Sequence, residues 1–189
     1  MGKLDGERAI VAEESVDDGR SWNAIGTVSH PPETAHRGLG EPHLVETASG
    51  KLVGLFRVGG GDMSERFLYQ ADSEDGGRTW TPARVTPMLG FPPHLIRLQD
   101  DRLLVVYGRR LSPYGQRTCL SSDEGATWEV ESERVVQAAP TRLASTAQET
   151  ILGQLVHLGQ HRTGRERSTG RRPLQQVRAM FLGQTHALV

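Results

Sequence analysis

The sequence is short of the residues that would mark several protein classes. Its 189 residues include one cysteine, Cys119, so no intrachain disulfide can form and stability must come from packing. The charges nearly cancel, with 22 Lys and Arg against 23 Asp and Glu, so the chain lacks the positive field that drives binding to nucleic acid. No run approaches the roughly 18 apolar residues of a membrane span. We therefore expect neither nucleic acid nor a membrane as partner.

The start of the chain also lacks a targeting signal, because Met1 to Glu14 is too polar to contain the apolar core of a signal peptide. As it stands, the sequence predicts a cytoplasmic protein. Secretion stays open as the alternative if a missing N-terminal half carried an export signal. With 36% hydrophobic and 24% charged residues, the composition is typical of a globular protein rather than a disordered or collagenous one.

Tryptophan is scarce, yet all three copies fall within one repeated pattern, Ser-x-Asp-x-Gly-x-Ser/Thr-Trp, at residues 15–22, 73–80 and 121–128. The starts lie 58 and 48 residues apart, a spacing that suits one supersecondary unit per repeat. The defining residues of the three boxes are Asp17, Gly19 and Trp22, then Asp75, Gly77 and Trp80, then Asp123, Gly125 and Trp128.

The chemistry of these boxes indicates hairpin turns. The Asp carboxylate can accept backbone N–H bonds across the turn, the Gly can adopt a positive φ, and the Ser or Thr hydroxyl adds a local bond. The Trp is expected to cover the sheet face beneath. We interpret the boxes as structural fasteners rather than catalytic groups.

A second repeat is interleaved with the first. The segment Pro42-His43-Leu44-Val45 is followed by Lys51-Leu52-Val53, and a similar pair of segments starts 51 residues later at Pro93-His94. Short β-rich runs at 52–57 and 103–107 are bounded by Gly, Asp and Ser, and two more at 67–71 and 117–120 lead into the boxes. The sequence therefore predicts an all-β fold over this region.

The box pattern resembles the Asp box of the sialidase (neuraminidase) superfamily, whose members are six-bladed β-propellers. The run from Glu41 through Gly50 to Arg57 is also similar to the glutamate-to-arginine strand pair in the later half of bacterial sialidases. The resemblance covers about residues 8 to 137. It implies an all-β fold made of blades of a six-bladed sialidase-type propeller.

The length allows only part of such a ring. At about 40 to 50 residues per blade, six blades need roughly 300 residues, so this chain supplies three to four. We expect residues 1–158 to form the blades and the missing portion to be the N-terminal half, with a second chain as one way to complete the ring. Residues 159–189 carry six Arg and one Glu, which predicts a basic tail that is either flexible or the product of a shifted reading frame.

The resemblance assigns three site residues. Glu41 matches the glutamate that activates a nucleophilic tyrosine, while Arg57 and Arg117 match two of the three arginines that hold the substrate carboxylate. A guanidinium suits this task because it offers paired donors and stays charged. The alternative is that both arginines are solvated charges at strand ends and that Glu41 is a turn residue.

Three expected functions remain unfilled. The nucleophilic tyrosine should follow the third box, but residues 137–145 contain none. The acid Asp and the first Arg belong to early blades; Arg37 and Asp62 are conceivable substitutes, although their Gly-rich surroundings favour loop residues. The isolated chain is thus expected to be incomplete as an enzyme.

Other candidates for the pocket are weaker. His94 and His43 occupy the same place in two repeats, which favours a shared packing or hydrogen-bonding task over a metal site. Tyr107 and Arg109 end an apolar strand and could line a central pocket, although such a Tyr is more often a core or rim residue. We expect no metal and no cofactor.

Two functions follow, and a third possibility is a damaged gene product with no function. The first is a sialidase-family exo-glycosidase that removes terminal sialic acids, or other acidic sugars, from glycoconjugates. The second is a non-catalytic propeller module that binds glycans or proteins. The missing tyrosine favours the second, whereas Glu41, Arg57 and Arg117 favour a catalytic ancestry.

Overall fold

The computed structural model describes residues 10–30, 37–138 and 176–181, and every regular element in these ranges is a strand or a short 3-10 turn. The predicted all-β class is confirmed. The elements are β1 (Ile10–Ser15), β2 (Asn23–Val28), β3 (Leu39–Glu46), β4 (Leu52–Val58), η2 (Met63–Glu65), β5 (Phe67–Ser73), β6 (Arg84–Leu89), β7 (Pro93–Arg97), β8 (Leu103–Arg109), β9 (Gly115–Ser121), η3 (Val130–Ser132), β10 (Arg134–Ala138) and β11 (Gln176–Phe181).

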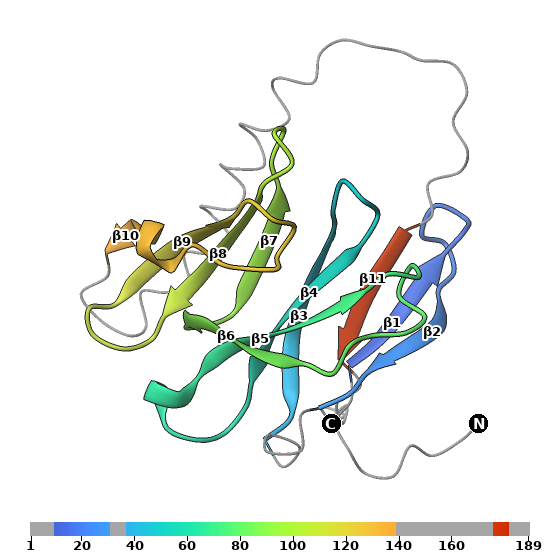
Figure 1. Ribbon diagram of the computed structural model, residues 1–189. Coiled ribbons are helices and arrows are strands. Elements are labelled where there is room, and N and C mark those ends of the chain that lie inside the picture. The colour runs from blue at the N-terminus through green and yellow to red at the C-terminus, as the bar shows by residue number, and fades with distance from the viewer. Residues whose placement is uncertain (1–9, 31–36, 139–175, 182–189) are drawn as a thin grey trace.

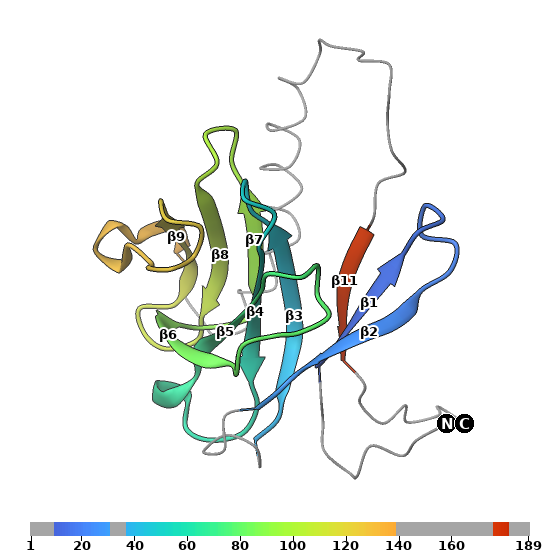
Figure 2. The same ribbon diagram turned by 45° about the vertical axis from the view of Figure 1, so that its right-hand side comes forward.

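The strands form three antiparallel sheets (Figure 1). The first sheet has the order β11-β1-β2, the second β3-β4-β5-β6 and the third β7-β8-β9-β10. In the second and third sheets each strand pairs with its neighbour in sequence, and the first strands, β3 and β7, approach each other (Figure 2). These are blades of a partial β-propeller, in agreement with the sequence.

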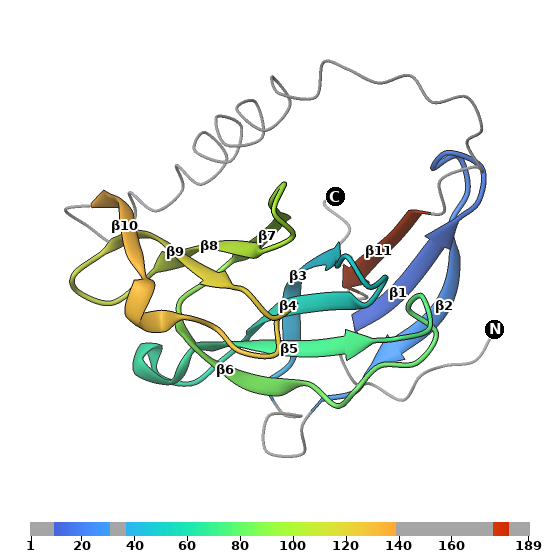
Figure 3. The same ribbon diagram turned by 45° about the horizontal axis from the view of Figure 1, so that its top comes forward.

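The predicted tail is described only at β11, whose backbone pairs antiparallel with β1, with Phe181 opposite Ile10 (Figure 3). The expected boundary near residue 158 and the rest of the tail lie outside the described residues.

β4 is the central strand of the packing, because both of its faces are buried. Side chains alternate across a strand, so Val53 and Leu55 face the third sheet while Phe56 and Val58 face the first. The core between the second and third sheets contains Leu68, Met88, Phe91, Leu95, Leu103, Val105, Tyr107, Cys119 and Trp128 besides Val53 and Leu55.

The three Asp boxes occupy the hairpins between β1 and β2, β5 and β6, and β9 and β10. In the first, the Asp17 carboxylate accepts bonds from the Ser21 N–H (2.8 Å) and the Ser21 and Ser15 hydroxyls. These bonds, the Ser21 hydroxyl foremost, lower the pKa of Asp17 to about 2. The second and third boxes repeat the pattern.

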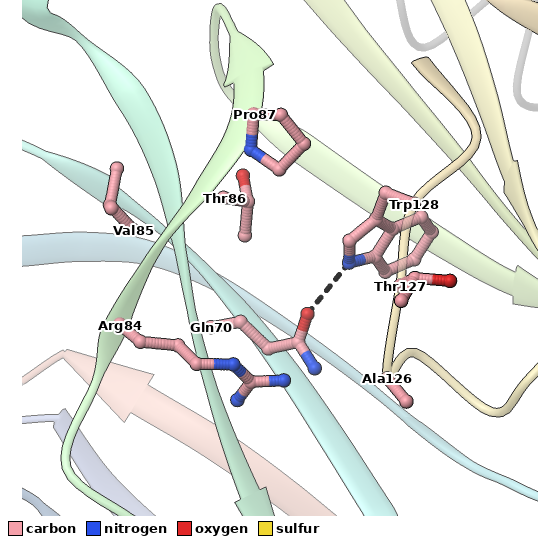
Figure 4. A pocket seen from close by; sticks show the side chains of 8 residues that line it. All are labelled: Gln70, Arg84, Val85, Thr86, Pro87, Ala126, Thr127 and Trp128. Atoms are coloured by element: carbon pink, nitrogen blue, oxygen red, sulfur yellow. Dashed lines mark hydrogen bonds between the residues drawn. The ribbon is translucent and has the colours of Figure 1, made fainter. Parts of the chain in front are cut away.

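The boxes differ in what their tryptophans contact. Trp22 and Trp80 each donate their indole N–H to a carbonyl of their own turn. Trp128 instead donates to Oε1 of the buried Gln70 in the second sheet, at 2.7 Å (Figure 4). The expectation that each Trp covers the sheet face beneath its turn did not include this bond, through which the third box fastens one blade to the preceding one.

This difference predicts unequal effects of removing the indole N–H. Trp128→Phe leaves Gln70 Oε1 buried without its donor, which costs about 1–3 kcal/mol of the free energy of unfolding. Trp22→Phe, the matched control, should cost less than about 1 kcal/mol, because water can reach its partly exposed turn. Urea unfolding followed by far-UV circular dichroism measures both, and equal losses would contradict the role of the Trp128 bond.

Candidate functional site

Glu41 lies in a β-bulge. Gly40 pairs with Arg57 and His43 pairs with Leu55, so Glu41 and Pro42 together oppose the single residue between them on β4. A bulge redirects side chains and is frequent beside functional sites. The bulge thus directs the carboxylate of Glu41 out of the regular strand pattern.

The backbone of Glu41 is strained. Its φ is +48°, and among the described residues it is the only non-glycine position with a positive φ that lies inside a strand. Its Oε1 lies 3.1 Å from Nη1 of Arg57, with the two side chains 41% and 34% exposed. Ion pairs this exposed are worth about 0–1 kcal/mol, less than the 1–3 kcal/mol typical of such strain. Stability alone does not explain this conformation.

Arg57 extends into the space between the second and third sheets. It follows Val53 and Leu55 on the same face of β4, at the end of the strand away from the second Asp box. Its guanidinium carbon lies 5.3 Å from the centre of the Phe91 ring. The predicted partners Glu41 and Arg57 are therefore brought together at one end of this space.

Arg117 faces the same space from the other side, but it is engaged. It is the cross-strand partner of Tyr107, which belongs to the core between these sheets. Its Nη2 donates to the Pro113 carbonyl at 2.9 Å, and its Nε lies 3.7 Å from Oε1 of Glu133. The side chain is 9% exposed. Arg117 thus already has a carboxylate partner from within the chain.

Glu133 joins Arg117 to Tyr107, whose hydroxyl donates to the second carboxylate oxygen. Burial, and then the carboxylate, raise the pKa of Tyr107 far above its ordinary value. A phenol in this state stays neutral and is a weak nucleophile. The structure places Tyr107 as a fully buried core residue, the alternative that the sequence already favoured.

Glu133 is the residue that sequence reasoning missed. It belongs to an acidic stretch between the third box and β10, and nothing in that stretch distinguishes it from a solvated surface charge.

Arg37 and Asp62 serve the loop between β4 and β5. Arg37 donates to the carbonyls of Gly59 (3.0 Å) and Gly60 (3.2 Å). Asp62 caps η2 and accepts bonds from the hydroxyl and N–H of Ser64, which lower its pKa. Both side chains are occupied by loop contacts, as the alternative interpretation expected.

His43 and His94 lie against each other, with ring centres 3.9 Å apart. Nδ1 of His43 accepts the Leu95 N–H at 3.2 Å, and burial, with His94 adding to it, lowers the pKa of His43 to about 4. Burial also lowers the pKa of His94. The repeated histidines therefore form a neutral packing contact between β3 and β7. Within the described ranges, no group of three His, Cys, Asp or Glu could hold a metal ion.

Arg109 ends β8, and its buried Nε has no hydrogen-bond partner in the part of the chain that the structure describes. Across residues 10–30, 37–138 and 176–181, no helix is long and apolar enough to cross a membrane.

A pocket of about 280 Å³ lies elsewhere, between β6 and the third Asp box (Figure 4). Its polar lining is already bonded: Gln70 to Trp128, Arg84 to Asp72 at 2.6 Å, and Thr86 to a backbone carbonyl. We therefore place the candidate site at the Glu41 end rather than in this pocket.

The positive φ of Glu41 predicts that glycine at this position is more stabilising than alanine. Glu41→Gly relieves the positive φ, whereas Glu41→Ala keeps it, and both lose the ion pair. The glycine variant should be more stable than the alanine variant by about 1 kcal/mol. Chemical unfolding of the two variants gives the difference.

Glu46, on the same strand and exposed, is the matched control. It has no positive φ, so Glu46→Gly should be less stable than Glu46→Ala by about 0.5–1 kcal/mol. The same order of stability at both positions would show that Glu41 is not strained.

The chain is similar to a known family of domains and to several solved structures. Residues 2–134 match the model of the BNR repeat-like domain. No curated protein matches the chain. Among solved structures, a protein of unknown function from Dyadobacter fermentans DSM 18053 has a TM-score of 0.56 and 28% identity, over 68% of this chain and 34% of that one.

Two enzymes are more distant. A Hadza microbial sialidase has a TM-score of 0.49 and 21% identity, over 61% of this chain and 29% of the sialidase. The GH93 α-L-arabinofuranosidase of Fusarium graminearum, solved with arabinobiose, has a TM-score of 0.45 and 18% identity, over 56% of this chain and 34% of the arabinofuranosidase. The chain spans about a third of the length of these solved structures. With a family model that matches residues 2–134, the chain belongs to the family of BNR repeat-like domains.

Proposed function

We propose that this chain carries one half of the site of a glycosidase that removes terminal acidic sugars, of the sialidase type. The observation that carries the proposal is the Glu41–Arg57 pair, held at a strained bulge and half exposed at one end of the space between two blades. In this proposal Arg57 and Arg117 recognise the sugar carboxylate.

The chemistry of Arg57 fits this task. Nη1 of Arg57 pairs with Glu41, whereas Nη2 of Arg57 makes no hydrogen bond within the described residues. A planar guanidinium binds a carboxylate through paired donors, and charged hydrogen bonds of this kind are about twice as strong as neutral ones. Arg57 can therefore donate to a ligand carboxylate and keep its ion pair with Glu41.

Glu41 would need a tyrosine to act as the resemblance implies. The chain has three, Tyr69, Tyr107 and Tyr114, all within the described ranges, and none hydrogen-bonds to Glu41. The nucleophile and the catalytic acid would then come from another part of the propeller, in a longer protein or a second chain. Removing members of a cooperating catalytic set usually costs orders of magnitude in rate.

A second candidate function is a non-catalytic module that binds glycans. The buried, protonated Tyr107 and the engaged Arg117 favour it for the chain by itself. The first candidate predicts hydrolysis of an acidic sugar once the ring is complete, whereas the second predicts saturable glycan binding without turnover.

The binding test uses the full chain and N-acetylneuraminic acid in isothermal titration calorimetry. We expect saturable binding with no hydrolysis of a fluorogenic sialoside. Arg57→Ala should weaken binding at least tenfold, because it removes a charged hydrogen bond worth about 1.5–3 kcal/mol. Arg102→Ala is the control, since Arg102 is exposed and pairs with Asp100 in the turn between β7 and β8.

The outcomes separate the candidates. Hydrolysis that disappears in Glu41→Ala would show a complete catalytic site in this chain. Equal binding of N-acetylneuraminic acid and neutral arabinobiose, or equal weakening by Arg57→Ala and Arg102→Ala, would overturn the acidic-sugar proposal.

A further inference from the structure

The second and third Asp boxes each rest on the sheet of the preceding blade. The Gly77 carbonyl oxygen in the second box would lie 2.1 Å from a Cβ on Gly26 of β2. A Cβ on Gly125 in the third box would lie 3.2 Å from Val53 of β4, and the Gly125 carbonyl accepts a bond from Gln70 at 2.8 Å. Gly77 and Gly125 are both buried. The contact of a box with a sheet is therefore the repeating joint between blades.

The first Asp box, at residues 15–22, has no preceding sheet in the described ranges, because its own sheet is the first of the three. Its glycine, Gly19, is half-buried, whereas the glycines of the other two boxes are buried. The turn itself is fully formed, since the Asp17 carboxylate accepts its bonds as its counterparts in the other boxes do. The first box thus presents a finished joint surface without the sheet on which the other boxes rest.

Four side chains of the second sheet receive the third box, and we name them the box seat: Val53, Gln70, Arg84 and Thr86. The last three line the pocket between β6 and the box (Figure 4). Arg84 donates through Nη2 to the Gly125 carbonyl at 3.4 Å. With the box in place, Val53, Gln70 and Thr86 are 0%, 1% and 5% exposed. The next blade therefore buries the seat of the blade before it.

The third sheet carries a second seat at the positions that the repeat predicts. Across β9 and β10, Thr118 pairs with Arg134, as the two corresponding seat residues of the second sheet do. An offset of 51 residues between the β3–β4 and β7–β8 hairpins places Leu104 at the position of Val53. Val136 follows Arg134 at the same interval as in the second sheet. These four residues of the third sheet, Leu104, Thr118, Arg134 and Val136, are the end seat.

The end seat is less covered than the box seat. Val136 is 43% exposed, whereas Thr86 is 5% exposed. Leu104 and Thr118 are half-buried, although their counterparts in the second sheet are buried. Further along β8 on the same face, Val106 is buried. The exposed part of this face is thus the part on which a box would rest.

We infer that this chain associates with a second copy of itself, the first Asp box of each copy resting on the end seat of the other. One chain carries both halves of the joint: a box without a preceding sheet and a seat without a box, among the described residues. Three sheets from each copy make six, the number of blades that the resemblance implies. A head-to-tail contact closes when the rotation between subunits completes a ring. This association needs no sugar ligand, so it stands apart from the proposed function.

One bond of the third box has no counterpart in this association. Glu124 accepts bonds from the N–H and the hydroxyl of Ser49, at 2.9 and 2.6 Å. The corresponding residues are Asp18 in the first box and Asp100 in the turn before β8. These two carboxylates repel each other in the associated state. Asp100 therefore weakens the contact, and a serine in its place should strengthen it.

Sedimentation velocity of the full chain, at several micromolar concentrations, tests the association. We expect the wild type to sediment as a concentration-dependent mixture of one and two chains. Val136→Lys should weaken the dimer about tenfold or more, because it buries an unpaired charge in the contact. Val85→Lys is the matched control, since Val85 is a 58% exposed valine on β6 of the middle blade. Asp100→Ser should tighten the dimer about twofold or more, because it removes a repulsion between partly exposed charges.

Cross-linking gives the arrangement of the two copies. Cys119 is buried, and burial raises the pKa of its thiol to about 11, so it does not compete for a maleimide. A bismaleimide is added to Asp18→Cys chains, to Asp100→Cys chains and to an equal mixture of the two. We expect cross-linked dimers in the mixture and only traces in either variant alone.

The outcomes decide between this association and others. A wild type that stays monomeric at every concentration, while circular dichroism shows that it is folded, would overturn the inference. Equal weakening by Val136→Lys and Val85→Lys would do the same, as would cross-linking of Asp100→Cys with itself, which would show two third sheets face to face. If the wild type dimerises head to tail and binds no acidic sugar, the association stands and the proposed function fails.

Discussion

The packing of the second sheet against the third is the contact on which the rest of the structure depends. Val53 and Leu55 of β4 are buried against the third sheet, and the same alternation directs Arg57 into the space between the sheets two residues later. A shift of one residue would turn all three toward the first sheet. The apolar contact therefore fixes where the charged groups lie, because the register that buries the core also selects the end at which Glu41 and Arg57 meet.

The features that could be predicted from the sequence are those set by short-range rules. An Asp box closes its own hydrogen bonds within eight residues, so its pattern predicts its hairpin without knowledge of the rest of the chain. Glu41 and Arg57 lie at the same end of the β3–β4 strand pair, and the resemblance was enough to predict their proximity. Glu133 could not be found this way. It meets Tyr107, 26 residues earlier, only because η3 returns the chain toward β8, and a charged residue in an acidic stretch carries no sign of a buried partner.

The three tryptophans show the same limit. Their boxes are nearly identical in sequence, yet Trp128 bonds to Gln70 of another sheet while Trp22 bonds to its own turn. What differs is the neighbouring surface: a Cβ on Gly125 would lie 3.2 Å from Val53, so the third box rests directly on β4. Local sequence determines the turn, whereas the contact that the turn makes is determined by the sheet beside it. Blade-to-blade contacts are long-range, and a single sequence does not record them.

Polar groups are satisfied to different degrees at the two ends of the space between the second and third sheets. At the Asp-box end, Gln70 and Arg84 use their amide and guanidinium in bonds to Trp128, Gly125 and Asp72, as expected of a region that holds blades together. At the other end, Glu41 is held in a left-handed conformation, and Arg66 keeps a buried Nε without a partner. Proteins that place strain and unsatisfied charge in one location usually do so where a ligand supplies the missing contact. Arg117 and Arg66 differ in their partners within the described residues. The guanidinium of Arg117 pairs with Glu133, whereas the guanidinium of Arg66 pairs with no carboxylate. A carboxylate from outside is the group that would complete the charge at this end, which is the chemistry that an acidic sugar brings.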